Sequence, residues 1–212
     1  MPLGDSITFA DLAPGAGYRV ELFHLSLTNK QLITFVGDQT NGPATVDGKP
    51  FPNHSEGHSG YVISGGDNGI QELVDASLAK NQPHIVLLMI GTNDIGGNRD
   101  LPNAPLRLGI LLDKIIQDAP NALLVVAKIT PTKLDVYNAR AMAFNAAIPA
   151  LIQERVAAGK HVAMVDMYAA FTANPNYQND WLRDTLHPTL TGYQVMGQTW
   201  YAAIKDLLPA PP

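Results

Sequence analysis

Three uninterrupted apolar runs, at residues 85–90, 123–127 and 162–165, most constrain how this 212-residue chain can fold. Runs that stay apolar, without alternating polar residues, are typical of strands buried on both faces of a parallel sheet. A shorter run at residues 33–36 predicts another strand, and residues 1–3 predict the short end of a first strand. The pattern therefore predicts a sheet of five strands.

Helical periodicity fills the intervals between these strands. Apolar residues recur at helical spacing at residues 18–27, 70–78, 106–116, 137–158 and 192–208. Asp67 or Asn68 is expected to cap the second of these helices, and Gly159 suits the end of the fourth. Strands separated by helices predict a three-layer α/β fold. We expect a single domain over residues 1–208, followed by a Pro-rich tail at 209–212 that is interpreted as the start of a linker.

Composition excludes several classes of function. The chain has no cysteine, which removes disulfides, thiolate metal sites and a cysteine nucleophile. Its formal net charge is -5 and it has no basic stripe, so a nucleic-acid partner is not expected. No apolar run approaches the roughly 18 residues of a membrane span. The first residues carry no signal-peptide pattern, as expected of a cytoplasmic protein or of a mature domain whose leader has been removed.

A serine follows the first predicted strand, in Gly4-Asp5-Ser6. A serine between a strand and a helix has an exposed hydroxyl and free backbone N–H groups beside it. Taken alone, the tripeptide favours a serine that merely caps a helix. The motif is not the nucleophile elbow of α/β-hydrolases, because that elbow needs glycine two residues after the serine and position 8 is Thr8.

Two further motifs carry polar side chains. Gly91-Thr92-Asn93-Asp94 follows the strongest predicted strand, where the Asn93 amide can point into a cleft or belong to a simple turn. Asp184 precedes His187 by three residues, so its carboxylate can reach the imidazole Nδ1 and leave Nε2 free to accept a proton. Pro188 prevents a helix from running through the histidine. The simpler interpretation is a loop histidine that touches a surface aspartate.

Together and in this order, the motifs resemble the SGNH hydrolases, also called the GDSL family. The matching blocks are Gly4-Asp5-Ser6-Ile7-Thr8, Gly57-His58-Ser59-Gly60, Gly91-Thr92-Asn93-Asp94 and Asp184-Thr185-Leu186-His187. The resemblance covers nearly the whole chain and implies a flavodoxin-like sheet of five parallel strands. It also implies an ester hydrolase that needs no cofactor and no metal.

Carried across residue by residue, the resemblance implies a catalytic triad. Ser6 would be the nucleophile, His187 the general base, and Asp184 the residue that orients His187. The oxyanion hole would consist of the backbone N–H groups of Ser6 and Gly60 and the side-chain amide of Asn93. The second block is the weakest match, and Gly57 competes with the glycine at position 60 for this role.

Family three of the carbohydrate esterases is a closer resemblance. It is carried by residues 1–8, 17–19, 35–37, 54–60 and 90–94. Members of that family resemble acetylxylan esterases and are typically secreted. The resemblance therefore implies an acetylated polysaccharide or oligosaccharide as the substrate, and it implies secretion. Charge and hydropathy, as described above, predict no nucleic-acid partner and no membrane partner. The long Gly- and Pro-rich segment at residues 38–60 is expected to be a loop that walls the acyl side of the cleft.

Other interpretations stay open at this point. The same site could hydrolyse lysophospholipids or other acyl esters, and a non-catalytic binding module could use residues 4–8 as a phosphate cradle. Alternation of His54, Glu56 and His58 could suggest a metal site. Trp181 either lines the cleft or is buried.

Two aspartates next to the motifs have an expected structural role. Asp5 and Asp94 are expected to hold the cleft loops by accepting hydrogen bonds from backbone N–H groups. A direct chemical role for either carboxylate is the less favoured alternative.

Overall fold

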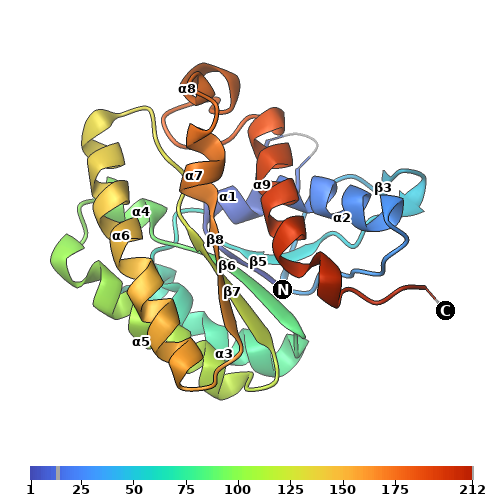
Figure 1. Ribbon diagram of the computed structural model, residues 1–212, viewed down its shortest axis with the longest axis horizontal. Helices are drawn as coiled ribbons and strands as arrows, with labels where there is room; N and C mark the ends of the chain where they lie inside the picture. The colour runs from blue at the N-terminus through green and yellow to red at the C-terminus, as the bar shows by residue number, and fades with distance from the viewer. Residues whose placement is uncertain (13–14, 212) are drawn as a thin grey trace.

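A six-stranded sheet forms the centre of the computed structural model, which describes residues 1–12 and 15–211 (Figure 1). The strand order is β2-β5-β1-β6-β7-β8. These strands are β1 (Pro2–Gly4), β2 (Gln39–Thr40), β5 (His54–Gly57), β6 (Ile85–Met89), β7 (Leu123–Lys128) and β8 (Val162–Asp166), and β3 (Thr45–Val46) and β4 (Lys49–Pro50) form a separate hairpin. Neighbouring strands are parallel except β2, which pairs antiparallel to β5. Pro212, the last residue of the predicted tail, lies outside the described residues.

The predicted three-layer α/β class is confirmed, but the sheet has six strands instead of five. Two of the strand assignments differ from the prediction. Residues 33–36 form no strand, and the place beside β1 belongs to β5, whose residues pair as Leu3↔Glu56 and Gly4↔Gly57. The β5 sequence His-Ser-Glu-Gly has none of the apolar residues that mark a buried strand, and β2 is only two residues long. Hydrophobic periodicity therefore could not indicate either strand.

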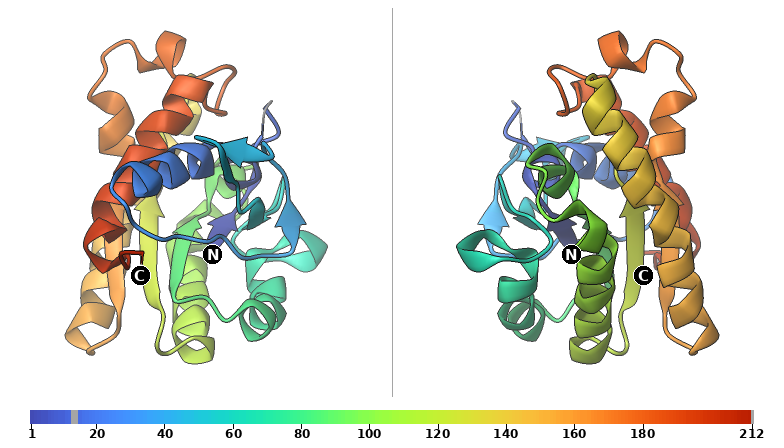
Figure 2. Two further views of the ribbon diagram at one scale, coloured as in Figure 1. Left: turned by 90° about the vertical axis from the view of Figure 1, so that its right-hand side faces the viewer. Right: turned by 90° about the vertical axis from the view of Figure 1, so that its left-hand side faces the viewer.

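Two helical layers cover the sheet. The helices are α1 (Ser6–Phe9), α2 (Tyr18–Thr28), α3 (Ile70–Asn81), α4 (Thr92–Gly96), α5 (Ala104–Asp118), α6 (Asp135–Ala157), α7 (Met167–Thr172), α8 (Tyr177–Asp180) and α9 (Leu190–Ile204), with 3-10 turns at Gly66–Asn68, Leu101–Asn103 and Lys205–Leu207. Helices α3, α5 and α6 pack side by side on one face, and α2 and α9 pack together on the other (Figures 1 and 2). Among the described helices, none is long and apolar enough to span a membrane.

The five long predicted helices all form, with small shifts at their ends. The cap of α3 differs from the prediction, because Gly69 occupies the N-cap position and no side chain bonds there. Asp67 and Asn68 lie in the preceding 3-10 turn instead. On the opposite face, α2 and α9 bury the rings of Tyr18 and Trp200, whose centroids are 5.9 Å apart. This contact joins segments from the two ends of the chain.

The sheet topology sets where the sequence motifs meet. β1, β5 and β6 are adjacent and parallel, so their carboxyl ends lie at one edge of the sheet. Ser6 follows the end of β1, the turn 58–60 follows β5, and Asn93 follows β6. The segment 38–60 is therefore not one loop. It contains β2, the β3–β4 hairpin and β5, and its last three residues form the turn at the motif edge.

Candidate active site

Asp5, and not Ser6, caps the first helix. The Asp5 Oδ1 atom accepts a hydrogen bond of 2.9 Å from the Ile7 N–H, and Ser6 is the first residue inside α1. The interpretation of Ser6 as a capping serine is therefore wrong. Its hydroxyl is left available, and Ser6 Oγ lies 2.9 Å from His187 Nε2.

His187 lies in a tight turn between α8 and α9. The Arg183 N–H donates to the His187 carbonyl at 2.9 Å, which closes the turn. Inside it, Asp184 Oδ1 accepts from the backbone N–H groups of Leu186 and His187 at 3.0 and 2.8 Å. The two Asp184 oxygens lie 3.1 and 3.0 Å from His187 Nδ1. The spacing of Asp184 and His187 thus places the carboxylate against Nδ1, as the sequence predicts.

The hydrogen-bond network assigns the proton of the imidazole. A carboxylate only accepts, so the hydrogen of a neutral His187 ring lies on Nδ1 and Nε2 is the acceptor for the Ser6 hydroxyl. Partial burial opposes ionisation of Asp184, but the backbone N–H groups and the imidazole outweigh it and hold the pKa of Asp184 below its ordinary value. The carboxylate is therefore ionised at neutral pH.

Gly60 and Asn93 face the same edge of the sheet as Ser6. The Asn93 amide donates one hydrogen to the Tyr61 carbonyl at 2.8 Å, which leaves the second hydrogen of the same nitrogen for another acceptor. Gly60 is exposed and has a φ of 81°, a left-handed conformation that glycine adopts without strain. Within residues 1–12 and 15–211, the backbone N–H groups of Ser6 and Gly60 donate to no protein acceptor.

Gly57, the competing glycine of the second block, has a different environment. It is buried at the end of β5, where an added Cβ would lie 2.3 Å from the Phe9 nitrogen. The close approach of α1 thus explains why glycine stands at this position. Of the two glycines, the one at position 60 is the one open to solvent.

Asp5 and Asp94, the chain neighbours of Ser6 and Asn93, are both buried. Asp94 Oδ2 accepts from the Ile63 N–H at 3.0 Å, and Asp94 Oδ1 accepts from Arg107 Nη1 at 2.6 Å. Both aspartates accept a hydrogen bond from a backbone N–H, which confirms the role expected for them. Burial raises the pKa of Asp94, and it raises the pKa of Asp5 to about 7. Asp5 has no cation against it, and its Oδ2 atom has no hydrogen-bond partner in the described part of the chain.

His54, Glu56 and His58 do not converge on one point. The His54 ring bonds the Gly37 carbonyl at 3.0 Å, whereas Glu56 accepts from His58 Nε2 at 2.7 Å. Across residues 1–12 and 15–211, no group of three His, Cys, Asp or Glu side chains is arranged to hold a metal ion. Trp181 is half-buried and packs edge-on against Phe171, with ring centroids 5.7 Å apart.

Two residues of the site escaped the sequence analysis. Tyr61 orients the Asn93 amide through a backbone carbonyl, an interaction that any residue type could make. Arg107 lies on α5 and bridges Asp94 and the Ser64 carbonyl, at 2.6 and 3.3 Å. No local motif marks an arginine 13 residues after its partner, so only the packing of α5 could identify it.

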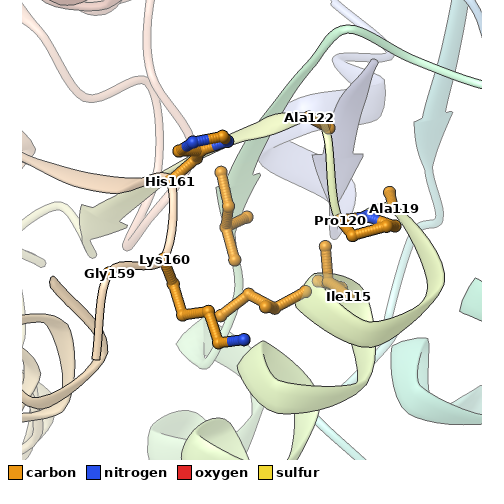
Figure 3. Close-up of a pocket in the computed structure, with 9 residues that line it drawn as sticks. Ile115, Ala119, Pro120, Ala122, Gly159, Lys160 and His161 are labelled. Atoms are coloured by element: carbon orange, nitrogen blue, oxygen red, sulfur yellow. The ribbon is translucent and has the colours of Figure 1, made fainter.

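The hollow drawn in Figure 3 lies at the amino-terminal ends of the strands, away from the carboxyl ends that Ser6 and Asn93 follow. Its volume is about 140 Å³, and its lining includes Pro120, Ala122 and His161, next to the first residues of β7 and β8. A larger groove of about 780 Å³ is lined by residues of α2, segment 30–34 and residues 210–211. Neither lining includes a residue of the Ser6–His187 arrangement. In parallel α/β sheets, ligands bind at the carboxyl ends of the strands, where that arrangement lies.

The model of the GDSL-like Lipase/Acylhydrolase family matches residues 3–195 of the chain. The chain belongs to this family. The match spans all four sequence blocks and confirms the resemblance to SGNH hydrolases. Family membership and the fold together place the chain among the SGNH-type proteins, and they support an ester hydrolase.

Several known proteins that are similar to this GDSL-family chain are named esterases. A multidomain esterase from Ruminococcus flavefaciens is 30% identical over 99% of the chain. A family 3 carbohydrate esterase from Clostridium thermocellum is 32% identical with a TM-score of 0.81, covering 98% of this chain and 94% of that one. The structure of an acetyl esterase mutant with an acetate ion is 27% identical with a TM-score of 0.76, covering 98% of each chain.

The curated relatives are much longer than this chain, and the match covers only part of each. The chain spans 29% of the length of the Ruminococcus esterase and 55% of a putative endoglucanase X from Acetivibrio thermocellus, to which it is 32% identical. The structural relatives support the predicted likeness to family three of the carbohydrate esterases.

Proposed function

We propose that this chain is a serine esterase that removes acetyl groups from carbohydrate esters, with acetylated xylan as its substrate. The observation that carries the proposal is the continuous hydrogen bonding from Ser6 Oγ through His187 to Asp184, at 2.9 Å and 3.0 Å. A serine hydroxyl bonded to a histidine that is itself oriented by a carboxylate is the arrangement of an activated nucleophile.

In the proposed mechanism, Ser6 Oγ attacks the carbonyl carbon of the acetyl ester while His187 Nε2 takes the hydroxyl proton. Asp184 stabilises the imidazolium that forms. The negative oxygen of the tetrahedral intermediate accepts hydrogen bonds from the N–H groups of Ser6 and Gly60 and from the Asn93 amide. His187 then protonates the departing sugar hydroxyl, and the acetyl group stays on Ser6.

Deacetylation repeats the cycle with water. His187 accepts a proton from the water that attacks the acetyl-serine, and it returns this proton to Ser6 Oγ as acetate leaves. Every step uses side chains and backbone N–H groups of this chain, so the proposed reaction needs no cofactor. The exposed position of Gly60 favours it over Gly57 as the oxyanion donor.

The substrate proposal draws on the similar proteins. One is named a family 3 carbohydrate esterase, and another is an acetyl esterase solved with an acetate ion. Because an acetylated polysaccharide lies outside the cell, we also propose that the protein is secreted. The lipolytic alternative would need an apolar channel for a long acyl chain, and the apolar groove in this structure is not lined by Ser6 or His187.

The test is acetate release from acetylated xylan and from other acetylated polysaccharides, with Ser6→Ala as the matched variant. We expect release by the wild-type protein and a loss of several orders of magnitude in Ser6→Ala, with an unchanged circular dichroism spectrum. Full activity in a folded Ser6→Ala protein would refute the nucleophile. Hydrolysis of simple esters without release from any acetylated polysaccharide would refute the carbohydrate substrate alone.

A further inference from the structure

Glu56 is a buried carboxylate on the polar strand β5. Its exposed fraction is 1%. One oxygen accepts from the Asp38 N–H, and the other accepts from His58 Nε2 at 2.7 Å. A buried carboxylate is costly unless its oxygens are hydrogen-bonded, so the position of Glu56 constrains the His58 ring.

His58 begins the turn that contains Gly60. Its N–H donates to the Gly4 carbonyl at 2.9 Å, which ties the turn to the strand that carries Ser6. Its carbonyl accepts from the Tyr61 N–H at 3.1 Å, and its ring stacks on the Tyr61 ring with centroids 4.8 Å apart. Backbone and side chain of one residue therefore hold both ends of the turn.

The same connection continues to Asn93. The Tyr61 carbonyl accepts the Asn93 amide at 2.8 Å, so Glu56, His58, Tyr61 and Asn93 form one chain of contacts. The Gly60 N–H lies within the turn that this chain holds, and the Asn93 amide lies at its end. Both groups are the proposed oxyanion donors in addition to the Ser6 N–H.

We propose that Glu56 and His58 are a positioning pair, which acts on catalysis by fixing the Gly60 N–H and the Asn93 amide relative to Ser6. The inference rests on the proposed esterase function. Glu56 is fully buried, so the pair acts through the turn and not on the reacting atoms. Donors stabilise the oxyanion only when they are aimed at the place where the charge develops. Loosening the turn should therefore lower kcat and leave KM almost unchanged.

Variants at position 58 test the pair with p-nitrophenyl acetate as substrate. His58→Leu removes the hydrogen bond to Glu56, whereas His58→Gln can offer an N–H to the same carboxylate. We expect His58→Leu to lower kcat about 10- to 100-fold, the loss typical of an ångström-scale misplacement. KM should stay almost unchanged, because the lost interaction is made only in the transition state, and His58→Gln should recover most of the rate. The control His24→Leu, which loses a bond to Asp47 on the β3–β4 hairpin, should retain full activity.

A double-mutant cycle with Asn93→Ala separates positioning from general stability. If His58 acts through the oxyanion donors, His58→Leu should cost clearly less in the Asn93→Ala background than in the wild type. Three results would each refute the positioning role of Glu56 and His58. They are an equal loss of kcat in both backgrounds, an effect on KM alone, and a wild-type kcat in His58→Leu. If His58→Leu does not fold, His58→Phe takes its place in the cycle, because its ring keeps the contact with Tyr61 but donates nothing to Glu56. Absence of Ser6-dependent hydrolysis in the wild type would reject the proposed function itself, which is distinguishable from an active enzyme that is insensitive to His58.

Discussion

Ser6 Oγ lies 2.9 Å from His187 Nε2, although the two residues are 181 positions apart in the chain. The serine follows a strand inside the sheet, and the histidine lies in a turn just before the last long helix. The segment between β7 and α6 also supports that turn, because the Lys133 N–H donates to the Thr185 carbonyl at 2.8 Å. Hydrolytic activity should therefore depend on the native packing of segments from both ends of the chain.

Asn93→Ala should lower kcat about 10²- to 10³-fold with little change in KM, as expected for the loss of one oxyanion donor. The amide donates to Tyr61 in the resting enzyme, so the second hydrogen is the one assigned to the oxyanion. Steady-state kinetics with p-nitrophenyl acetate measures both constants. Asn121→Ala, at an exposed site before β7, is the control, and both its kcat and its KM should equal those of the wild type. A change in KM alone would instead make Asn93 a substrate-binding residue.

Asp5→Asn should change how stability depends on pH. Burial raises the pKa of Asp5 from 3.8 to about 7, so between these values the folded state holds a proton that the unfolded state has lost. The wild type should therefore lose stability relative to Asp5→Asn as pH rises from about 4 to 7, by roughly 1.4 kcal/mol per pH unit at most. Above pH 7 the difference should level off.

Urea unfolding of both proteins at pH 5 and pH 8 measures this effect. The exposed Asp67→Asn substitution serves as the control for the loss of one carboxylate at the surface. If the free-energy difference between wild type and Asp5→Asn is the same at both pH values, Asp5 does not retain its proton in the folded state.

Arg107→Met should destabilise the protein by about 3 kcal/mol or more, because it leaves the buried Asp94 carboxylate without its cation. The Arg107 Nη1 atom lies 2.6 Å from Asp94 Oδ1, and Asp94 is fully buried. The double variant Asp94→Asn/Arg107→Met should be more stable than Arg107→Met alone, since no charge is then left unpaired. Thermal and urea unfolding give the comparison. Equal stability of the single and double variants would show that the ion pair is not what holds α5 to this loop.

Acetate esters should be hydrolysed faster than esters of longer acids. The acyl group must lie beside the Gly60 turn, which is bordered by the stacked rings of His58 and Tyr61. Each added methylene without room for it brings strain instead of burial. Comparing kcat/KM for p-nitrophenyl acetate, butyrate and octanoate measures the preference. A maximum at octanoate, with no acetate released from xylan, would move the protein to the lipolytic alternative and leave the triad unaffected.

The local sequence was sufficient to predict the apolar strands and the long helices. Strands β6, β7 and β8 are covered on both faces, so their residues must be almost uniformly apolar and stand out in the chain. The Asp184–His187 contact was also predictable, because it is made across a turn of four residues. Strand β5 was not, since its buried Ser55 and Glu56 are polar and its place beside β1 depends on pairing with a distant segment.

Residue order along the chain shows which polar residues follow which strands, and it therefore predicts that Ser6 and Asn93 share one edge of a parallel sheet. How that edge is supported depends on the packing of distant elements. Glu56 reaches His58 because β5 turns its side chain inward, and Arg107 reaches Asp94 because α5 packs beside the loop after β6. The Arg107–Asp94 contact carries no local signal, because it depends on the packing of two elements and not on the spacing of residues along one of them. The Glu56–His58 contact spans only two residues, but the burial that fixes it depends on the place of β5 in the sheet.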